Sequence, residues 1–327
     1  MAYPAHPVLG DNPTMKTHPI AALLIVIATL AICFVGFRLL SSRAVDDAPT
    51  PAATKPVPLA TQPPLPAGAR QIETAHYLIY SSATEEQTAR VAEAVEALHA
   101  AYTRFFAGTP GMQSNPAKLQ LVLYKDQAEF KAHNRSSPWA EAYYLPPRSH
   151  AYYGEGDNPI HWMTHEATHQ LNREVAHLRK TKWIDEGLAD YFGSSWIADG
   201  TLTPGSIDPA TYPIWWLPQL SLTGNLQDDI ATGKVIPLHA IVSGKGGPDI
   251  NRNVNLYYIE YWSLTHFLFH YQEGKYAAQY RQLIATEGTL ENFERLIGPV
   301  DQIQAEWYTY LQGVAKASRP TRVRLMD

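Results

Sequence analysis

An uncharged run near the N-terminus constrains the fold of this chain more than any other feature. Residues 20–37 read IAALLIVIATLAICFVGF. As a helix with a rise of about 1.5 Å per residue, this run spans roughly 27 Å, close to the hydrocarbon core of a bilayer. It is longer than the apolar core of a secretory signal, and Arg38 and Arg43 follow it. We therefore expect a retained transmembrane helix at 20–40, which contacts the membrane, after a short N-terminal tail at 1–19.

The sequence features around this helix leave alternatives for its cleavage and its orientation in the membrane. Residues 42–44, Ser-Arg-Ala, are a passable cleavage site, so a cleaved signal is the alternative to a retained anchor. Lys16 precedes the run, whereas Arg38, Arg43 and Lys55 follow it, which does not favour an exported C-terminal part. Large domains translocate largely regardless of charge, and an anchor this close to the N-terminus is typical of an export signal. We expect the main domain in the bacterial periplasm or at the cell surface.

A proline-rich segment separates the apolar run from the rest of the chain. Residues 44–69 contain seven prolines and few large apolar side chains, so they predict an extended linker at 41–69. The remaining residues, 70–327, form one expected domain. The net charge of -5 argues against a nucleic-acid partner. The single cysteine, Cys33, excludes an intramolecular disulfide, and the residues do not specify an oligomeric state.

The first half of the expected domain alternates strand and helix patterns. Strands are expected at 75–81 and 118–124, helices at 84–106 and 126–133, and a hairpin within 142–154. The second half is helical, with glycine and proline concentrated in residues 199–253, where we expect long loops. Its expected helices are 158–176, 184–197, 254–271, 274–287 and 300–316. The pattern predicts an α+β fold with a small mixed sheet and a helical C-terminal half.

A five-residue motif within the helical half indicates chemistry. It reads His165-Glu166-Ala167-Thr168-His169. Residues four apart lie on one helix face about 6 Å apart, so the two imidazoles can grip one metal ion. Glu166 would then lie beside the metal-bound water and act as a general base, while a zinc ion lowers the pKa of that water from about 15.7 toward 7.

A second helical segment, WIDEGLADYF at 183–192, offers a third ligand. Glu186 supplies the carboxylate that two histidines still lack at a zinc site. Asp190, one turn later, is placed to accept the second N–H of a ligand histidine. Asp185 is expected to face away from Glu186, as a cap or surface residue. His161 lies about 12 Å along the helix from His169, too far to share an ion, so we expect a structural or groove role for it.

The segments THEATHQL and WIDEGLADYF together resemble the gluzincin zinc metallopeptidases, in particular the peptidase-MA-like family. The resemblance extends more loosely over most of residues 76–271. It implies a zincin-like catalytic domain with His165, His169 and Glu186 as ligands of Zn²⁺, Glu166 as catalytic base and Asp190 as the residue that orients a ligand. By its place in the family-like segment YYIEYW, Tyr258 is the candidate for stabilising the oxyanion; core packing is the competing interpretation.

These observations predict a membrane-anchored zinc metallopeptidase that hydrolyses peptide bonds of a peptide or protein substrate. Glu166 would deprotonate the zinc-bound water and return the proton to the leaving amine. The alternative of another class is a non-catalytic zincin-like scaffold of the cell envelope, which binds proteins or wall polymers through residues 199–253. A third hypothesis, cleavage of a non-peptide amide, differs from the first only in substrate.

Overall fold

The computed structural model describes residues 62–109, 117–179 and 181–319 of the chain. The predicted tail, the predicted transmembrane segment and most of the predicted linker lie outside these residues.

The described residues form a five-stranded sheet in the order β1-β2-β3-β5-β4. Its strands are β1 (Arg70–Glu73), β2 (Tyr77–Ser81), β3 (Leu119–Tyr124), β4 (Ala142–Leu145) and β5 (Arg148–Tyr152). The three central strands β2, β3 and β5 are parallel, and the edge strands β1 and β4 run antiparallel to their neighbours. The sheet is therefore mixed.

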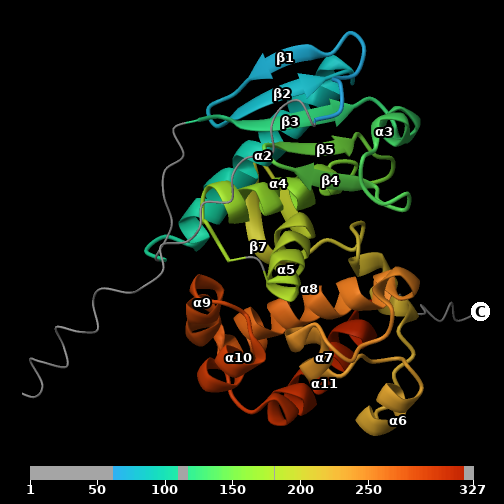
Figure 1. The fold of residues 1–327 in the computed structure, drawn as a ribbon, viewed down its shortest axis with the longest axis vertical. Coiled ribbons are helices and arrows are strands. Elements are labelled where there is room, and N and C mark those ends of the chain that lie inside the picture. Colours follow the sequence, from blue (N-terminus) through green and yellow to red (C-terminus); the bar gives the residue numbers. More distant parts are fainter. Residues whose placement is uncertain (1–61, 110–116, 180, 320–327) are drawn as a thin grey trace, which may run out of the picture. The chain divides into compact units, whose positions relative to one another are not determined.

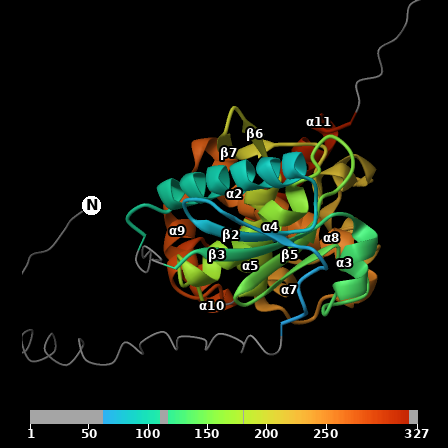
Figure 2. The same ribbon diagram turned by 90° about the horizontal axis from the view of Figure 1, so that it is seen from above.

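Alternating side chains give the sheet two buried faces. Leu119, Leu121 and Leu123 of β3 pack in the main core with α2 (Glu85–Phe105) and α4 (His161–Glu174). Val122 and Tyr124 point the other way, into a small cluster with α3 (Gln127–His133). This is the period-two alternation of a strand buried on both sides. Figure 2 shows α2 running along the sheet beside β2 and β3.

Beyond α4 the structure is mostly helical. Figure 1 shows α5 (Lys182–Gly193) between α4 and α8 (Val254–His270), and both neighbours contact it extensively. The remaining helices are α6 (Leu226–Ala231), α7 (Leu238–Ser243), α9 (Ala277–Ala285), α10 (Leu290–Leu296) and α11 (Val300–Ala317), with short 3-10 turns η2 (Ile214–Gln219), η3 (Ile250–Arg252) and η4 (Tyr271–Glu273). A two-stranded ribbon, β6 (Ser195–Ala198) and β7 (Thr201–Ile207), follows α5.

Two glycines let α5 approach its neighbours closely. A Cβ at Gly187 would lie 2.8 Å from the backbone oxygen of Tyr261 and 2.2 Å from the hydroxyl of Thr265, both in α8. A Cβ at Gly193 would lie 3.2 Å from the Cα of His165 in α4. Larger residues at these positions would push the three helices apart.

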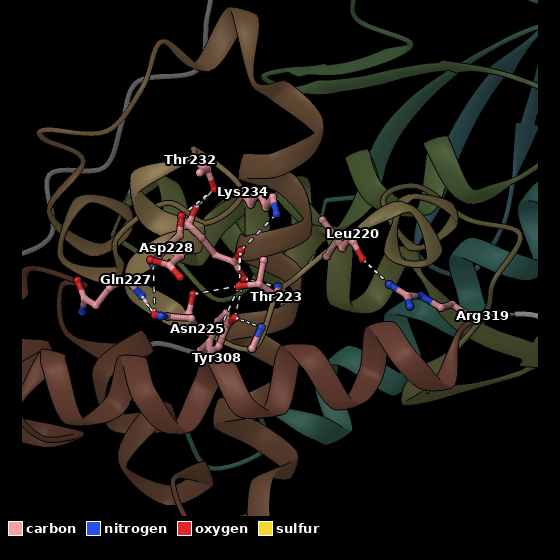
Figure 3. Close-up of polar contacts among 11 residues, drawn as sticks. Leu220, Thr223, Asn225, Gln227, Asp228, Thr232, Lys234, Tyr308 and Arg319 are labelled. Carbon is pink, nitrogen blue, oxygen red and sulfur yellow. Dashed lines mark hydrogen bonds and ion pairs between the residues drawn. The ribbon is translucent and has the colours of Figure 1, made fainter.

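The region expected to be long loops is ordered through polar contacts with α11. Figure 3 shows Tyr308 of α11 close to Thr223. Both of these residues donate hydrogen bonds to Asp229. The buried carboxylate of Asp229 accepts hydrogen bonds from the Tyr308 hydroxyl (2.6 Å), the Thr223 N–H (2.8 Å) and the Thr223 hydroxyl (2.9 Å). A buried carboxylate with three donors fixes the segment against α11.

The expected fold class needs a correction. The structure is α+β, with a mixed sheet and a helical half, but the transmembrane helix that we expected as part of it is not among the helices of the described residues. In the part of the chain that the structure describes, no helix combines the length and apolarity needed to cross a bilayer. The longest of these helices, α2, is amphipathic, with buried residues such as Val91 and Leu98 on one face and charged residues on the other. Residues 20–40, for which we expected the transmembrane helix, lie outside the described residues. The predicted location of the domain stays a prediction.

Candidate metal centre

The helices α4 and α5 bring three ligand atoms together. His165 and His169 are one turn apart on α4, and their Nε2 atoms lie 3.2 Å from each other. Glu186 of α5 places Oε2 at 3.4 Å from the His169 Nε2 and 3.7 Å from the His165 Nε2. The three ligand atoms lie within 4.8 Å of one another and can hold a metal ion.

These separations fit a tetrahedral site. Two ligand atoms bound at about 2.0–2.1 Å from a tetrahedral ion lie about 3.3 Å apart. The three distances between Nε2, Nε2 and Oε2 are 3.2, 3.4 and 3.7 Å. The side chains are therefore set at the spacing that one small ion requires, before any rearrangement.

A carboxylate stands behind each imidazole. Asp190 Oδ1 lies 3.0 Å from the His165 Nδ1, and Asp185 Oδ1 lies 3.1 Å from the His169 Nδ1. A carboxylate at Nδ1 favours a proton on that nitrogen, which leaves the Nε2 lone pair directed at the ion. Asp190 thus lies where the sequence predicted it, against a candidate ligand histidine.

Asp185 does not have the surface role that we expected. Its Oδ1 also accepts a hydrogen bond from the Asn172 Nδ2 (2.9 Å), and the Asn172 Oδ1 accepts one from the Tyr102 hydroxyl (2.7 Å). A line of contacts therefore runs from Tyr102 of α2 through Asn172 of α4 and Asp185 of α5 to the imidazole of His169. The helical spacing of Asp185 and Glu186 could not predict the contact of Asp185 with His169. Spacing tells which residues share a face of α5, but not which face of α5 packs against α4.

The direction of the two helices explains the pairing. His165 is near the start of α4 and contacts Asp190 near the end of α5, whereas His169 contacts Asp185 near the start of α5. The two segments are thus antiparallel at the site. His165 therefore contacts Asp190, which follows Glu186 in α5, and His169 contacts Asp185, which precedes it.

The charges in the site are strongly coupled. Burial opposes protonation of His165, but the carboxylates of Asp190 and Glu186 outweigh it and raise its pKa to about 10. Burial likewise opposes protonation of His169, whose pKa is nevertheless raised well above its usual value by Asp185 and Glu186. Burial favours the neutral form of Glu186, but the two histidines lower its pKa. A cation at this point therefore competes with protons for the same nitrogens.

Glu166 lies beside the two ligands on α4. It is 6% exposed, and its carboxylate accepts no hydrogen bond from any other described residue, whereas its backbone oxygen accepts one from the Ser149 hydroxyl (3.0 Å). The pKa of Glu166 is raised above its usual value because burial disfavours the charged carboxylate. The neighbouring charges of His165 and His169 offset only part of this rise. The backbone contact fixes this turn of α4 to β5 and leaves the carboxylate free.

The other candidates surround the three ligands. The ring of Tyr258 from α8 stacks on that of His165, with centroids 6.3 Å apart, and burial raises its pKa well above the usual value. Tyr212, which the sequence did not single out, packs against Tyr258 with centroids 5.5 Å apart. His161 is not one of the three residues whose ligand atoms converge, and its Nδ1 donates to the backbone oxygen of Asn158 (2.7 Å).

Part of the chain matches the model of a protein family. Residues 160–289 match the model of a family described as "Protein of unknown function (DUF1570)". The matched part contains the three ligand residues, Glu166 and Tyr258. No curated protein matches the chain. The chain is thus similar, from α4 to α9, to a family without an assigned activity.

Proposed function

We propose that this protein is a zinc-dependent metallopeptidase of the gluzincin type, which hydrolyses peptide bonds. One observation carries the proposal: His165 Nε2, His169 Nε2 and Glu186 Oε2 converge, with a carboxylate behind each imidazole. Two imidazoles and one carboxylate are the protein ligands of zinc peptidases whose fourth position is left to water or substrate. The resemblance of THEATHQL and WIDEGLADYF to gluzincins supports the same conclusion.

The metal site and Glu166 have different proposed roles in hydrolysis. The chemistry that a zinc ion held there supplies is Lewis acidity toward the substrate carbonyl and the attacking water. Glu166 takes a proton from that water on a carboxylate oxygen and returns it to the leaving amine. Burial moves the pKa of Glu166 upward, toward the pH at which both transfers must occur.

Tyr258 is the proposed donor to the oxyanion. A tyrosine hydroxyl is protonated at neutral pH, which is the form that donates, and burial raises the pKa of Tyr258 further above its usual value. Asp185 and Asp190 act through the histidines, as positioning residues that hold the tautomer and ring orientation.

The test compares the wild-type protein with Glu166→Gln. Both proteins should contain one zinc per chain by elemental analysis, because Glu166 is not a ligand. Mass spectrometry of a peptide library should show cleavage by the wild-type protein and a loss of about 100- to 10,000-fold in the variant, the usual contribution of a general base. Glu93→Gln on the exposed face of α2 removes the same charge and should leave cleavage unchanged.

The outcomes separate the candidate functions. Cleavage by Glu166→Gln at the wild-type rate would refute the catalytic role. Stoichiometric zinc without cleavage in either protein would favour the non-catalytic scaffold. Cleavage confined to non-peptide amides would retain the chemistry and change the substrate.

A further inference from the structure

A line of polar contacts reaches the candidate metal centre from α2. The Tyr102 hydroxyl of α2 donates a hydrogen bond to Asn172 Oδ1 of α4 (2.7 Å), and Asn172 Nδ2 donates one to Asp185 Oδ1 of α5 (2.9 Å). The same Asp185 oxygen lies 3.1 Å from the Nδ1 of His169. Side chains from three helices therefore meet at the carboxylate that stands behind one candidate ligand.

The chemistry of these groups gives the line a direction. A carboxylate only accepts hydrogen bonds, whereas the amide of Asn has one end that donates and one that accepts. Asp185 therefore requires the NH2 end of Asn172, and the amide oxygen is then turned toward Tyr102, whose hydroxyl donates to it. Without that hydroxyl the amide oxygen has lost its donor, and the Asn172 side chain is free to rotate away from Asp185.

Both supporting residues lie in the core. Tyr102 is 0% exposed and Asn172 is 2% exposed. The ring of Tyr102 packs against those of Phe106 and Phe192, with centroids 4.8 and 5.2 Å away, and this packing fixes the direction of its hydroxyl. Water does not compete for hydrogen bonds at such a place, so two donors are enough to set the position of a carboxylate.

Asp185 needs this support more than Asp190 does. The Asp190 side chain is 0% exposed, whereas that of Asp185 is 28% exposed and can turn toward water. The Nδ1 of His169 is buried, and no other described residue offers it a hydrogen bond. If Asp185 turned away, His169 would lose the group that sets its tautomer and ring orientation.

We propose that Asn172 and Tyr102 are positioning residues of the metal centre, an inference that rests on the metal site of the proposed function. Tyr102 fixes the amide of Asn172, Asn172 holds Asp185 Oδ1 at the His169 Nδ1, and this contact directs His169 Nε2 at the ion. The two residues touch neither the ion nor the substrate. They contribute to metal affinity from one and two contacts behind Asp185.

The experiment measures the zinc Kd of the full-length protein by competition with a chromophoric chelator. Asn172→Ala should raise the Kd by about 3- to 10-fold, at most the lower end of the loss that follows when the partner of a ligand histidine is itself removed. Tyr102→Phe keeps the ring and removes the hydroxyl, and it should raise the Kd by about 2- to 10-fold, the usual contribution of one hydrogen bond.

Double variants test the route through Asp185. In an Asp185→Ala background no acceptor remains for the Asn172 amide, so adding Asn172→Ala should change the Kd by less than about twofold. Asp190→Asn alters the partner of the other histidine. In that background Asn172→Ala should retain its full effect, because the two contacts are independent.

A second readout separates positioning from a general loss of stability. In the cobalt-loaded protein, the N–H protons of the ligand imidazoles have strongly shifted NMR resonances, and their exchange with water reports how firmly each is held. Asn172→Ala and Tyr102→Phe should accelerate the exchange of the His169 N–H and leave that of His165 unchanged.

Tyr308→Phe is the matched control. Its hydroxyl is also buried and donates to a carboxylate, that of Asp229, but belongs to α11. This variant should lower the free energy of unfolding without changing the zinc Kd or the exchange of either imidazole N–H.

Two results would overturn the proposal. One is a zinc Kd that stays at the wild-type value in folded Asn172→Ala or, should that variant not fold, in Tyr102→Phe. The other is an equally large effect of Asn172→Ala with and without Asp185, because Asn172 would then act by another route.

Failure of the proposed function gives a different result. A wild-type protein that binds zinc and cleaves no peptide would contradict the peptidase, while the affinities of the variants would still test the positioning. Cleavage together with unchanged affinities would contradict the positioning alone. A wild-type protein that binds no zinc would overturn both.

Discussion

The carboxylates behind the two histidines should contribute unequally to metal affinity. Asp190 is 0% exposed at its side chain, whereas Asp185 is 28% exposed. Replacing either by Asn keeps the size and removes the charge. Loss of such a partner usually lowers metal affinity by about 10- to 100-fold, or about 1.4–2.7 kcal/mol. Because solvent screens the exposed carboxylate, we expect about 10-fold for Asp185→Asn and about 100-fold for Asp190→Asn.

The assay is competition for zinc with a chromophoric chelator at fixed pH. Asp301→Asn, an exposed acidic residue on α11, is the matched control and should leave the zinc Kd unchanged. Thermal unfolding of each zinc-free variant checks that the fold is retained. A zinc Kd within twofold of wild type for both Asp185→Asn and Asp190→Asn, in folded protein, would refute the argument that these carboxylates orient the ligands.

Three further predictions follow from the site and its supporting contacts. Since the pKa of His165 is raised to about 10, zinc must displace protons at neutral pH, and the affinity for zinc should rise with pH. Calorimetry in two buffers of different ionisation enthalpy should detect the released protons, whereas a binding heat that does not depend on the buffer would contradict this prediction. Gly187→Ala should lower the free energy of unfolding by about 1–3 kcal/mol through overpacking, measured with urea; Gly313→Ala, where an added Cβ meets nothing within 4 Å, should not destabilise, and equal effects at both positions would contradict the packing argument. Asp229→Ala strands buried donors, including the Tyr308 hydroxyl, and should cost about 2–5 kcal/mol in the same assay; a loss below about 0.5 kcal/mol would contradict the anchoring role.

Local periodicity was enough to predict most of the elements. The helix expected at 84–106 is α2 at Glu85–Phe105, and the strand expected at 118–124 is β3 at Leu119–Tyr124. Both carry a clear apolar period, and α2 also has a recognisable start in the capping box of Thr84 and Gln87. Residues 199–253 were harder, because β7, α6 and α7 are short and depend on contacts such as that of Asp229 with Tyr308, far along the chain.

In the candidate site, too, local spacing predicts some contacts and the packing of helices decides the others. His165 and His169 are close because a helix repeats every 3.6 residues, which the sequence alone determines. Glu186 and Asp190 share a face of α5 for the same reason. The sequence does not contain the crossing of α4 and α5, and this crossing decides that Asp185 contacts His169 and that Asp190 contacts His165.

What the sequence by itself determined is therefore what lies within about one helical turn: the pair of imidazoles, the neighbouring Glu166, and the spacing of acids on α5. Tertiary structure decided which acid orients which histidine and how Asn172 supports Asp185. The physical reason is that helical periodicity sets directions only around one helix axis. The packing of separate axes depends on close approaches such as that at Gly193, which follow from the shape of the whole core.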